Sequence, residues 1–235
     1  TVLFLSPFLL ITTLYFLFFR LDLLNNNTIY IYIMNKIIHQ IFLDIGLGPI
    51  EDHPIYMDSI HTNITMNPDW EYKLWTDKDV DKLIEEQSET IRDMVKDFPT
   101  RMFLCDFIRP IILKKYGGIY MDLDVCCKVP LSSLIQDGHL FIVGRDMKEV
   151  PKMCNNVISL PHEYYQLLID YYLVEYYYKK GMSIYKTWKG RFLLQSVGAY
   201  AFLRFLKIHG FKENIFMSWD LYFTDYGTKA WVGRC

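Results

Sequence analysis

The segment Tyr116-Gly117-Gly118-Ile119-Tyr120-Met121-Asp122-Leu123-Asp124 carries the strongest structural signal in the chain. It predicts a helix that ends at a glycine pair and a buried strand that follows, from Ile119 to Val125. In a continuing strand, side chains at positions i and i+2 point the same way, so Asp122 and Asp124 can approach one cation. Mg²⁺ and Mn²⁺ take oxygen ligands and often bridge carboxylates to a diphosphate. The pair therefore predicts a metal site, although acidic pairs also occur at strand ends by chance.

A helix is expected upstream, from about residue 100 to residue 116. Asp106 and Arg109 lie three positions apart on it, and hence on one face. The guanidinium of Arg109 presents a fork of donors that suits a sugar hydroxyl, a phosphate or Asp106 itself. A purely structural ion pair is the alternative. Gly117-Gly118 permits a tight reversal and a close approach of the backbone to a ligand.

Short apolar runs alternate with helical stretches after residue 34. Strands are expected at Lys36–Leu43, Trp70–Trp75, Ile119–Val125 and Leu140–Gly144, and helices at Pro54–Asn67, Lys78–Gln87 and Thr100–Tyr116. This alternation predicts an α/β domain with a mainly parallel sheet. Ligands of such sheets bind beyond the carboxyl ends of the strands, where His39-Gln40, Trp75 to Asp77 and the acidic pair all fall.

Composition restricts the possible functions. Half of the 235 residues are hydrophobic and the formal net charge is −2, so the chain has material for a core and no general attraction to nucleic acid. The five cysteines form no zinc pattern, and buried thiols are the simplest interpretation. A tyrosine-rich helix is expected after residue 162. We interpret its aromatic face as core or an interaction surface, with a sugar-stacking platform as the alternative.

The amino-terminal segment is strongly apolar. Residues 2–19 contain no charge and approach the length of a membrane-spanning helix. We expect a hydrophobic segment at 1–24, a polar linker at 25–33 and the globular domain at 34–235. A signal-anchor would place the protein on a membrane of the secretory pathway, in a Golgi-like position. A cleaved signal peptide, a buried helix or a gene-model extension are alternatives, and without the segment a cytoplasmic location is expected.

The run from Cys105 to Val125 resembles the core of glycosyltransferase family 32, the family of DXD sugar-binding-region enzymes that includes initiating α-1,6-mannosyltransferases. The glucosyltransferase domains of large clostridial toxins have a similar core. The stretches Lys36–Phe42 and Asn67–Asp77 resemble the first and second strands of the family. The resemblance implies a GT-A-type nucleotide-sugar-binding fold, a Mn²⁺ or Mg²⁺ cofactor, and transfer with retention of anomeric configuration.

The same resemblance implies roles for individual residues. Asp124 would ligate the metal directly, and Asp122 would contact the donor and reach the metal through water. Asp106 and Arg109 would hold the donor sugar, with Asp122, Asp124 and Arg109 as the catalytic set. The expected donor-binding residues are His39, Gln40, Phe42, Trp75, Asp106, Arg109, Gly118, Tyr120, Asp122 and Trp231.

Three positions depart from the family pattern. Phe42 stands where the family has Trp, which keeps an aromatic face and loses the indole donor. Pro110 removes a backbone hydrogen bond inside the expected helix and predicts a kink there. The late His…Ser-Trp region of the family is matched only by Tyr226 to Trp231, without a His.

The function expected from these features is transfer of a hexose from a nucleotide sugar, GDP-mannose or a UDP-hexose, to a glycan, glycolipid or protein hydroxyl. A catalytically degenerate protein that binds a nucleotide sugar or a glycan is the first alternative. The second is a haloacid-dehalogenase-like phosphatase, with Asp122 as the nucleophile and Asp124 as the acid/base. The sequence does not name the sugar, the base or the acceptor.

Overall fold

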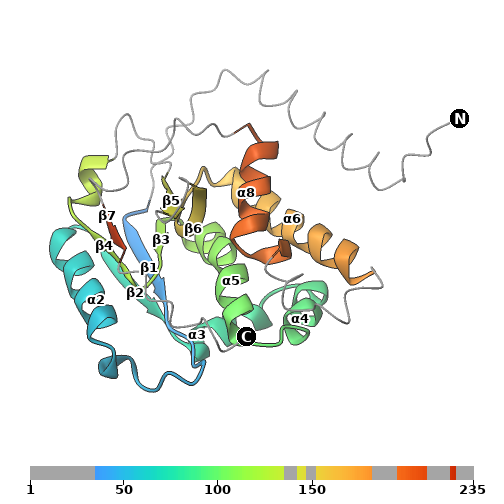
Figure 1. Cartoon of the computed structure of the whole chain (residues 1–235), viewed down its shortest axis with the longest axis horizontal. Helices are drawn as coiled ribbons and strands as arrows, with labels where there is room; N and C mark the ends of the chain where they lie inside the picture. The colour runs from blue at the N-terminus through green and yellow to red at the C-terminus, as the bar shows by residue number, and fades with distance from the viewer. Residues whose placement is uncertain (1–34, 135–141, 147–151, 182–194, 211–222, 226–235) are drawn as a thin grey trace, which may run out of the picture. The chain divides into compact units, whose positions relative to one another are not determined.

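The computed structural model describes residues 35–134, 142–146, 152–181, 195–210 and 223–225 (Figure 1). The hydrophobic segment, the linker and Trp231 lie outside these residues. No helix in the described ranges is both long enough and apolar enough to cross a membrane.

Alternating strands and helices build the domain. The strands are β1 (Ile37–Ile41), β2 (Glu71–Trp75), β3 (Ile119–Met121), β4 (Val125–Cys127), β5 (Ile142–Asp146), β6 (Lys152–Ser159) and β7 (Phe223–Asp225). The helices are α2 (Pro54–Met66), α3 (Asp77–Glu85), α4 (Glu89–Lys96), α5 (Arg101–Tyr116), α6 (Glu163–Lys180) and α8 (Ala199–Ile208). Short 3-10 helices lie at Ile50–Asp52 and Leu131–Leu134.

The central sheet has the strand order β2-β1-β3-β6-β5, and β4 pairs separately with β7. β1 pairs parallel with both β2 and β3, whereas β6 pairs antiparallel with β3 and β5. Among the described strands of this sheet, β6 alone therefore runs opposite to the rest. The mixed α/β class and the mainly parallel sheet expected from the sequence are confirmed.

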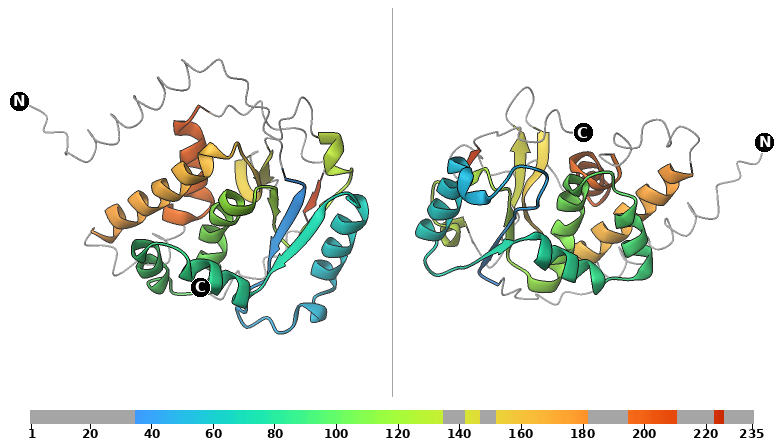
Figure 2. Two further views of the ribbon diagram at one scale, coloured as in Figure 1. Left: turned by 180° about the vertical axis from the view of Figure 1, so that it is seen from behind. Right: turned by 90° about the horizontal axis from the view of Figure 1, so that it is seen from below.

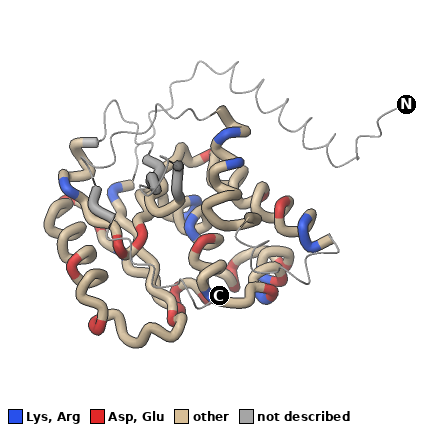
Figure 3. The backbone as a smooth tube through the Cα atoms, in the orientation of Figure 1, with Lys and Arg blue, Asp and Glu red and all other residues tan. Residues whose placement is uncertain are grey.

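Helices cover both faces of the sheet. Figures 1 and 2 show α2 against one face, and α5, α6 and α8 against the other. The larger apolar cluster lies on the α5 side, around Phe107, Ile112 and Phe202, and a smaller one on the α2 side is built around Ile38 and Met121. Basic and acidic positions are interspersed over the described elements, as Figure 3 shows. Most apolar burial thus stabilises the α5 side of the sheet.

The strand predicted from Ile119 to Val125 is wrong in one respect. β3 ends at Met121, and the backbone N–H of Val125 donates to the carbonyl of Asp122 at 3.0 Å. Asp122 to Val125 thus form a tight turn between two short strands. The two carboxylates are brought together by this turn, and not by the alternation of a continuous strand.

Other boundaries of the expected elements follow the expectations closely, but several described elements were not predicted. The expected strand near residue 140 is β5, shifted to Ile142–Asp146. Pro110 lies within α5, which runs unbroken to Tyr116. The sequence analysis did not predict α4, β6, α8 or β7, and β6 contributes residues to the site.

The tyrosine-rich helix is α6. Tyr165, Tyr172 and Tyr176 are buried in the main core, whereas Tyr177 and Tyr178 are exposed. The core interpretation is confirmed for the three buried tyrosines. Cys126 and Cys127 are buried, and burial raises the pKa of the Cys127 thiol to about 12, so this thiol stays protonated at neutral pH.

Candidate active site

Asp122 and Asp124 lie on the turn that follows the carboxyl end of β3. The backbone N–H of Asp122 donates to the carbonyl of Asn156 on β6, at 2.7 Å. Both aspartates are partly exposed, while Leu123 between them is buried. The turn therefore anchors itself through Leu123 and presents two carboxylates near the surface.

Arg109 is the centre of the charged network behind this turn. It is only 5% exposed, and its Nη2 lies 3.1 Å from Asp106 Oδ1 and 3.0 Å from Asp122 Oδ1. Its guanidinium also stacks on the ring of Tyr120, 4.6 Å from the ring centre. The hydroxyl of Tyr120 donates to Asp122 Oδ1 at 2.5 Å. Four predicted site residues thus meet in one buried network.

Asn155 completes the network, and the sequence analysis missed it. Its carbonyl accepts from Arg109 Nη1 at 2.7 Å, and its side-chain Nδ2 donates to Asp106 Oδ1 at 2.8 Å. Asn155 lies on β6, 46 residues from Arg109 along the chain. The Asn155-Asn156 pair, two polar side chains inside an otherwise apolar strand, was the available signal.

Loss of hydration on folding dominates the electrostatics of the turn, although the Asp122 side chain stays partly exposed. It raises the pKa of Asp122 to about 7, against the opposing effect of Arg109 and with a smaller contribution from the charge of Asp124. Burial also raises the pKa of Tyr120, which therefore remains a hydrogen-bond donor at neutral pH. A second cation beside the turn would favour the ionised form of Asp122.

The residues of the turn fit a Mg²⁺ or Mn²⁺ ion that shares its ligands with a substrate. Within the described ranges, no group of three or more His, Cys, Asp or Glu side chains could enclose a metal. Asp122 and Asp124 offer two carboxylates instead. Mg²⁺ is commonly held by one or two carboxylates together with substrate phosphates and water. The donor set is therefore suited to a metal–diphosphate complex.

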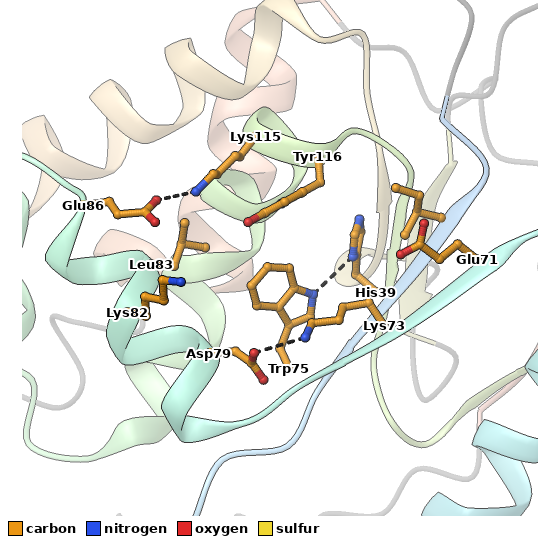
Figure 4. A pocket seen from close by; sticks show the side chains of 11 residues that line it. His39, Glu71, Lys73, Trp75, Asp79, Lys82, Leu83, Glu86, Lys115 and Tyr116 are labelled. Atoms are coloured by element: carbon orange, nitrogen blue, oxygen red, sulfur yellow. Dashed lines mark hydrogen bonds and ion pairs between the residues drawn. The ribbon is translucent and has the colours of Figure 1, made fainter.

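His39 and Trp75 belong to a different part of the same sheet face. They line a pocket of about 410 Å³ together with Tyr116 and residues of β2 and α3, as Figure 4 shows. Trp75 Nε1 donates to His39 Nδ1 at 3.1 Å, and His39 Nε2 lies 3.0 Å from the carbonyl of Gly117. Because Nδ1 accepts, Nε2 carries the proton and donates to Gly117. Burial lowers the pKa of His39 to about 4.

This pocket does not include the charged network. Its lining contains none of Asp106, Arg109, Asp122 or Asp124. Two ion pairs flank it, Lys73 with Asp79 at 3.1 Å and Lys115 with Glu86. His39 and Trp75 thus line a pocket that does not include the acidic turn, and their role in donor binding stays a prediction.

Gln40 points to the opposite face of β1 from His39, because neighbouring residues alternate along a strand. Its Nε2 donates to the carbonyl of Asp122 at 3.0 Å, and its Oε1 accepts from the hydroxyl of Tyr72 at 2.8 Å. Gln40 thus holds the backbone of the acidic turn through the carbonyl of Asp122.

The remaining predicted residues contact protein groups. Phe42 follows β1, and its ring centre lies 6.1 Å from that of His53. Gly118 has φ +80, and a Cβ on it would lie 2.3 Å from the carbonyl oxygen of Ile37. Gly118 therefore serves the close packing of β3 against β1.

Comparison with known proteins agrees with this geometry. Residues 55–140 match the family described as "Glycosyltransferase sugar-binding region containing DXD motif". The chain is 39% identical over 72 residues to inositol phosphoceramide mannosyltransferase 3 of Schizosaccharomyces pombe. This match covers 31% of this chain and 20% of that protein. The chain is also 30% identical over 79 residues to the initiation-specific alpha-1,6-mannosyltransferase of Candida albicans. That match covers 32% of this chain and 20% of that protein. The matched stretches thus span about a fifth of each relative.

A solved structure shares the fold. The PaToxG glycosyltransferase superposes with a TM-score of 0.52 over 77% of this chain and 73% of that chain, at 16% sequence identity. At this identity the superposition shows a shared fold. Residues 55–140 of this chain are therefore similar to the sugar-binding region of glycosyltransferases that contain a DXD motif.

Proposed function

We propose that this protein is a metal-dependent glycosyltransferase that moves a hexose from a nucleotide sugar to an acceptor hydroxyl, with retention of anomeric configuration. The observation that carries the proposal is the network of Asp106, Arg109, Tyr120 and Asp122 behind the acidic turn. It orders a buried cation and two carboxylates at the carboxyl end of the sheet, where ligands of α/β folds bind.

Asp124 and Asp122 would hold Mn²⁺ or Mg²⁺ in this proposal. A bound divalent cation neutralises the charge that develops on a departing nucleotide diphosphate. Asp122 already uses Oδ1 for Arg109 and Tyr120. These contacts support Asp122 as a residue held in place to face the donor, and the family resemblance supports Asp124 as the direct metal ligand.

Arg109 and Asp106 would orient the donor sugar. Both are held by Asn155, so their positions are set before the substrate arrives. Preorganised groups of this kind lower the barrier because they need no rearrangement during the reaction. The acceptor hydroxyl would attack the face of the sugar from which the diphosphate leaves, and positioning would supply much of the rate.

The relatives suggest the substrates. One is named for mannosyl transfer to inositol phosphoceramide and the other for initiating α-1,6-mannosyl transfer. We therefore propose GDP-mannose as the first donor to test, with UDP-hexoses next, and a glycolipid or glycan as the acceptor. Residues 2–19 would bring the enzyme to a membrane of the secretory pathway, where such acceptors reside.

The test is nucleotide release from a panel of nucleotide sugars by the full chain, with Mn²⁺ or with EDTA. We expect release from one donor, loss of release in EDTA, and at least a ~100-fold loss in Asp124→Asn. Asp93→Asn is the matched control, because Asp93 is an exposed carboxylate paired with Lys96 on α4. It should keep the wild-type rate.

The outcomes separate the alternatives. Metal-dependent donor binding without release would identify a degenerate binding protein. A covalent aspartyl-phosphate on Asp122 would identify a phosphatase. Wild-type release by Asp124→Asn would refute the assignment of this turn as the metal site.

A further inference from the structure

The buried side of helix α2 carries a stripe of polar side chains. Ser59, Asn63 and Asn67 recur every fourth residue and are 0%, 0% and 1% exposed. Positions outside this stripe expose apolar side chains, including Met57 and Ile64. Helices on a sheet normally bury an apolar stripe, and buried polar groups persist where they make hydrogen bonds. The stripe of α2 must therefore have bonding partners beneath it.

Those partners are backbone groups that follow the acidic turn. The carbonyl of Val125 accepts from Ser59 Oγ at 2.8 Å and from Asn63 Nδ2 at 2.9 Å. The N–H of Cys127 donates to Asn63 Oδ1 at 2.9 Å. Farther along, the N–H of Leu131 donates to Asn67 Oδ1 at 2.6 Å.

Asn63 therefore acts on β4 as a neighbouring strand would. Its amide both donates to and accepts from the backbone, at two residues of the strand that begins directly after Asp124. β4 pairs with β7 through Val125 and Cys127 as well. The first strand residue after the metal-binding turn is thus held between a partner strand and the side chains of α2.

Both ends of the acidic turn are held by buried side chains from one face of the sheet. Gln40 bonds the carbonyl of Asp122 at the start, and Ser59 and Asn63 bond the carbonyl of Val125 at the end. A carboxylate on a turn inherits its position from the backbone at each end. Displacement of a reacting group by about 1 Å can cost about 100-fold in rate.

We propose that Asn63 is a positioning residue for the metal-binding turn: it fixes β4 so that Asp124 stays in register with Asp122 and Arg109. This role rests on the proposed function, since it assumes that the turn holds a metal–diphosphate complex. Asn63 also begins the glycosylation sequon Asn63-Ile64-Thr65. In the folded chain this sequon cannot be glycosylated, because the amide nitrogen of Asn63 is buried and hydrogen-bonded.

The test compares Asn63→Ala with Asn67→Ala in the full chain. Both variants remove a buried amide from the same stripe. Asn63 bonds the backbone of β4, whereas Asn67 bonds the backbone of Leu131, well beyond Asp124 along the chain, and contacts β4 only through the Cys127 thiol. The affinity for Mn²⁺ with GDP, and separately with UDP, is measured by calorimetry, next to amide exchange at Cys127 and the melting temperature. These readouts do not require turnover.

We expect Asn63→Ala to weaken binding of Mn²⁺ with the nucleotide about 10-fold or more and to lose protection at the Cys127 amide. Asn67→Ala should stay within about twofold of the wild-type affinity at a similar loss of melting temperature. Ser59→Ala, which removes one of two donors to Val125, should weaken binding by a smaller factor. It tests the same role if Asn63→Ala does not fold.

Equal affinities in the Asn63 and Asn67 variants, or losses that follow the melting temperature alone, would show a merely structural role and overturn the proposal. Failure of the wild-type chain to bind Mn²⁺ with either nucleotide would refute the proposed function, and the positioning role with it. Tight wild-type binding that Asn63→Ala leaves unchanged would refute the positioning role alone.

Discussion

At the scale of single residues, the site depends on one buried cation. Arg109 lies between the carboxylates of Asp106 and Asp122 and has a third partner in the carbonyl of Asn155. Burying a charge is unfavourable unless its partners compensate, so each member of this set requires the others. Loss of hydration likewise raises the pKa of the Asp122 carboxyl when no metal is bound.

The stability of the protein in acid should depend on His39, which is buried beside Trp75. The folded chain holds the pKa of His39 at about 4, whereas the ordinary value is 6.5. As the pH falls from 6.5 to 4, the unfolded chain binds a proton that the folded chain does not, so the free energy of unfolding decreases. The stabilisation is complete above pH 6.5, and about 3 kcal/mol of it is lost by pH 4.

Urea unfolding between pH 7.5 and 4.5 measures this loss, with His39→Gln as the control. Glutamine can still donate to Gly117 and accept from Trp75 but does not titrate. Between pH 6.5 and pH 4.5, the unfolding free energy of His39→Gln should fall less steeply with decreasing pH than that of the wild type, by up to about 1.4 kcal/mol per pH unit. Identical slopes in the two proteins would contradict the assignment of a neutral, buried His39.

At the scale of elements, the glycine pair between α5 and β3 determines how closely two strands pack. Gly117 and Gly118 have φ values of +70 and +80, which glycine adopts without strain. Gly118 additionally lies against the carbonyl of Ile37 on β1. Any side chain there would push β3, and hence the acidic turn, away from β1.

Gly118→Ala should therefore lower the free energy of unfolding by about 3–5 kcal/mol, through backbone strain and overlap with Ile37. Gly210→Ala is the matched control, because Gly210 has φ +74 and a Cβ added there would meet nothing within 4 Å. It should cost only about 1–2 kcal/mol, the strain of the left-handed conformation. Chemical denaturation measures both values, and equal losses would contradict the packing role of Gly118.

At the scale of the whole molecule, the sheet collects site residues from distant segments. Parallel strands place their carboxyl ends at one edge, and β6 returns antiparallel to bring Asn155 and Asn156 beside α5 and the turn. These segments come together only in the folded chain. A ligand that binds at the acidic turn would therefore stabilise the folded state over the unfolded one.

Mn²⁺ with GDP, or with UDP if that is the donor nucleotide, should raise the melting temperature of the full chain. At about 100 times the dissociation constant, the stabilisation is about 2.7 kcal/mol, which corresponds to roughly 5–10 °C for a chain of this size. Asp124→Asn should abolish the shift, and Asp93→Asn should retain it. A thermal melt checks this prediction, and a shift that survives in Asp124→Asn would place the metal elsewhere.

Local sequence signals were sufficient for several elements and for half of the site. Thr76 and Asp79 begin α3 with a mutual hydrogen bond, and Gly117 ends α5, because these contacts involve residues only a few positions apart. Asp106, Arg109 and Asp122 could be proposed together from helix spacing and family resemblance. Such features depend on neighbouring residues, and a linear pattern contains them.

The remaining features depend on contacts between distant segments, which a linear pattern does not contain. Asn155 joins the site across 46 residues, and Asn63 reaches Cys127 across 64. The turn at Asp122 replaces a predicted strand because its backbone bonds are completed by β6 and by side chains of α2. His39 and Gln40 adjoin in sequence, yet the pleat of β1 sends them to opposite faces of the sheet. Residue types in the sequence were thus sufficient to predict a candidate site, whereas the arrangement of its side chains required the packed fold.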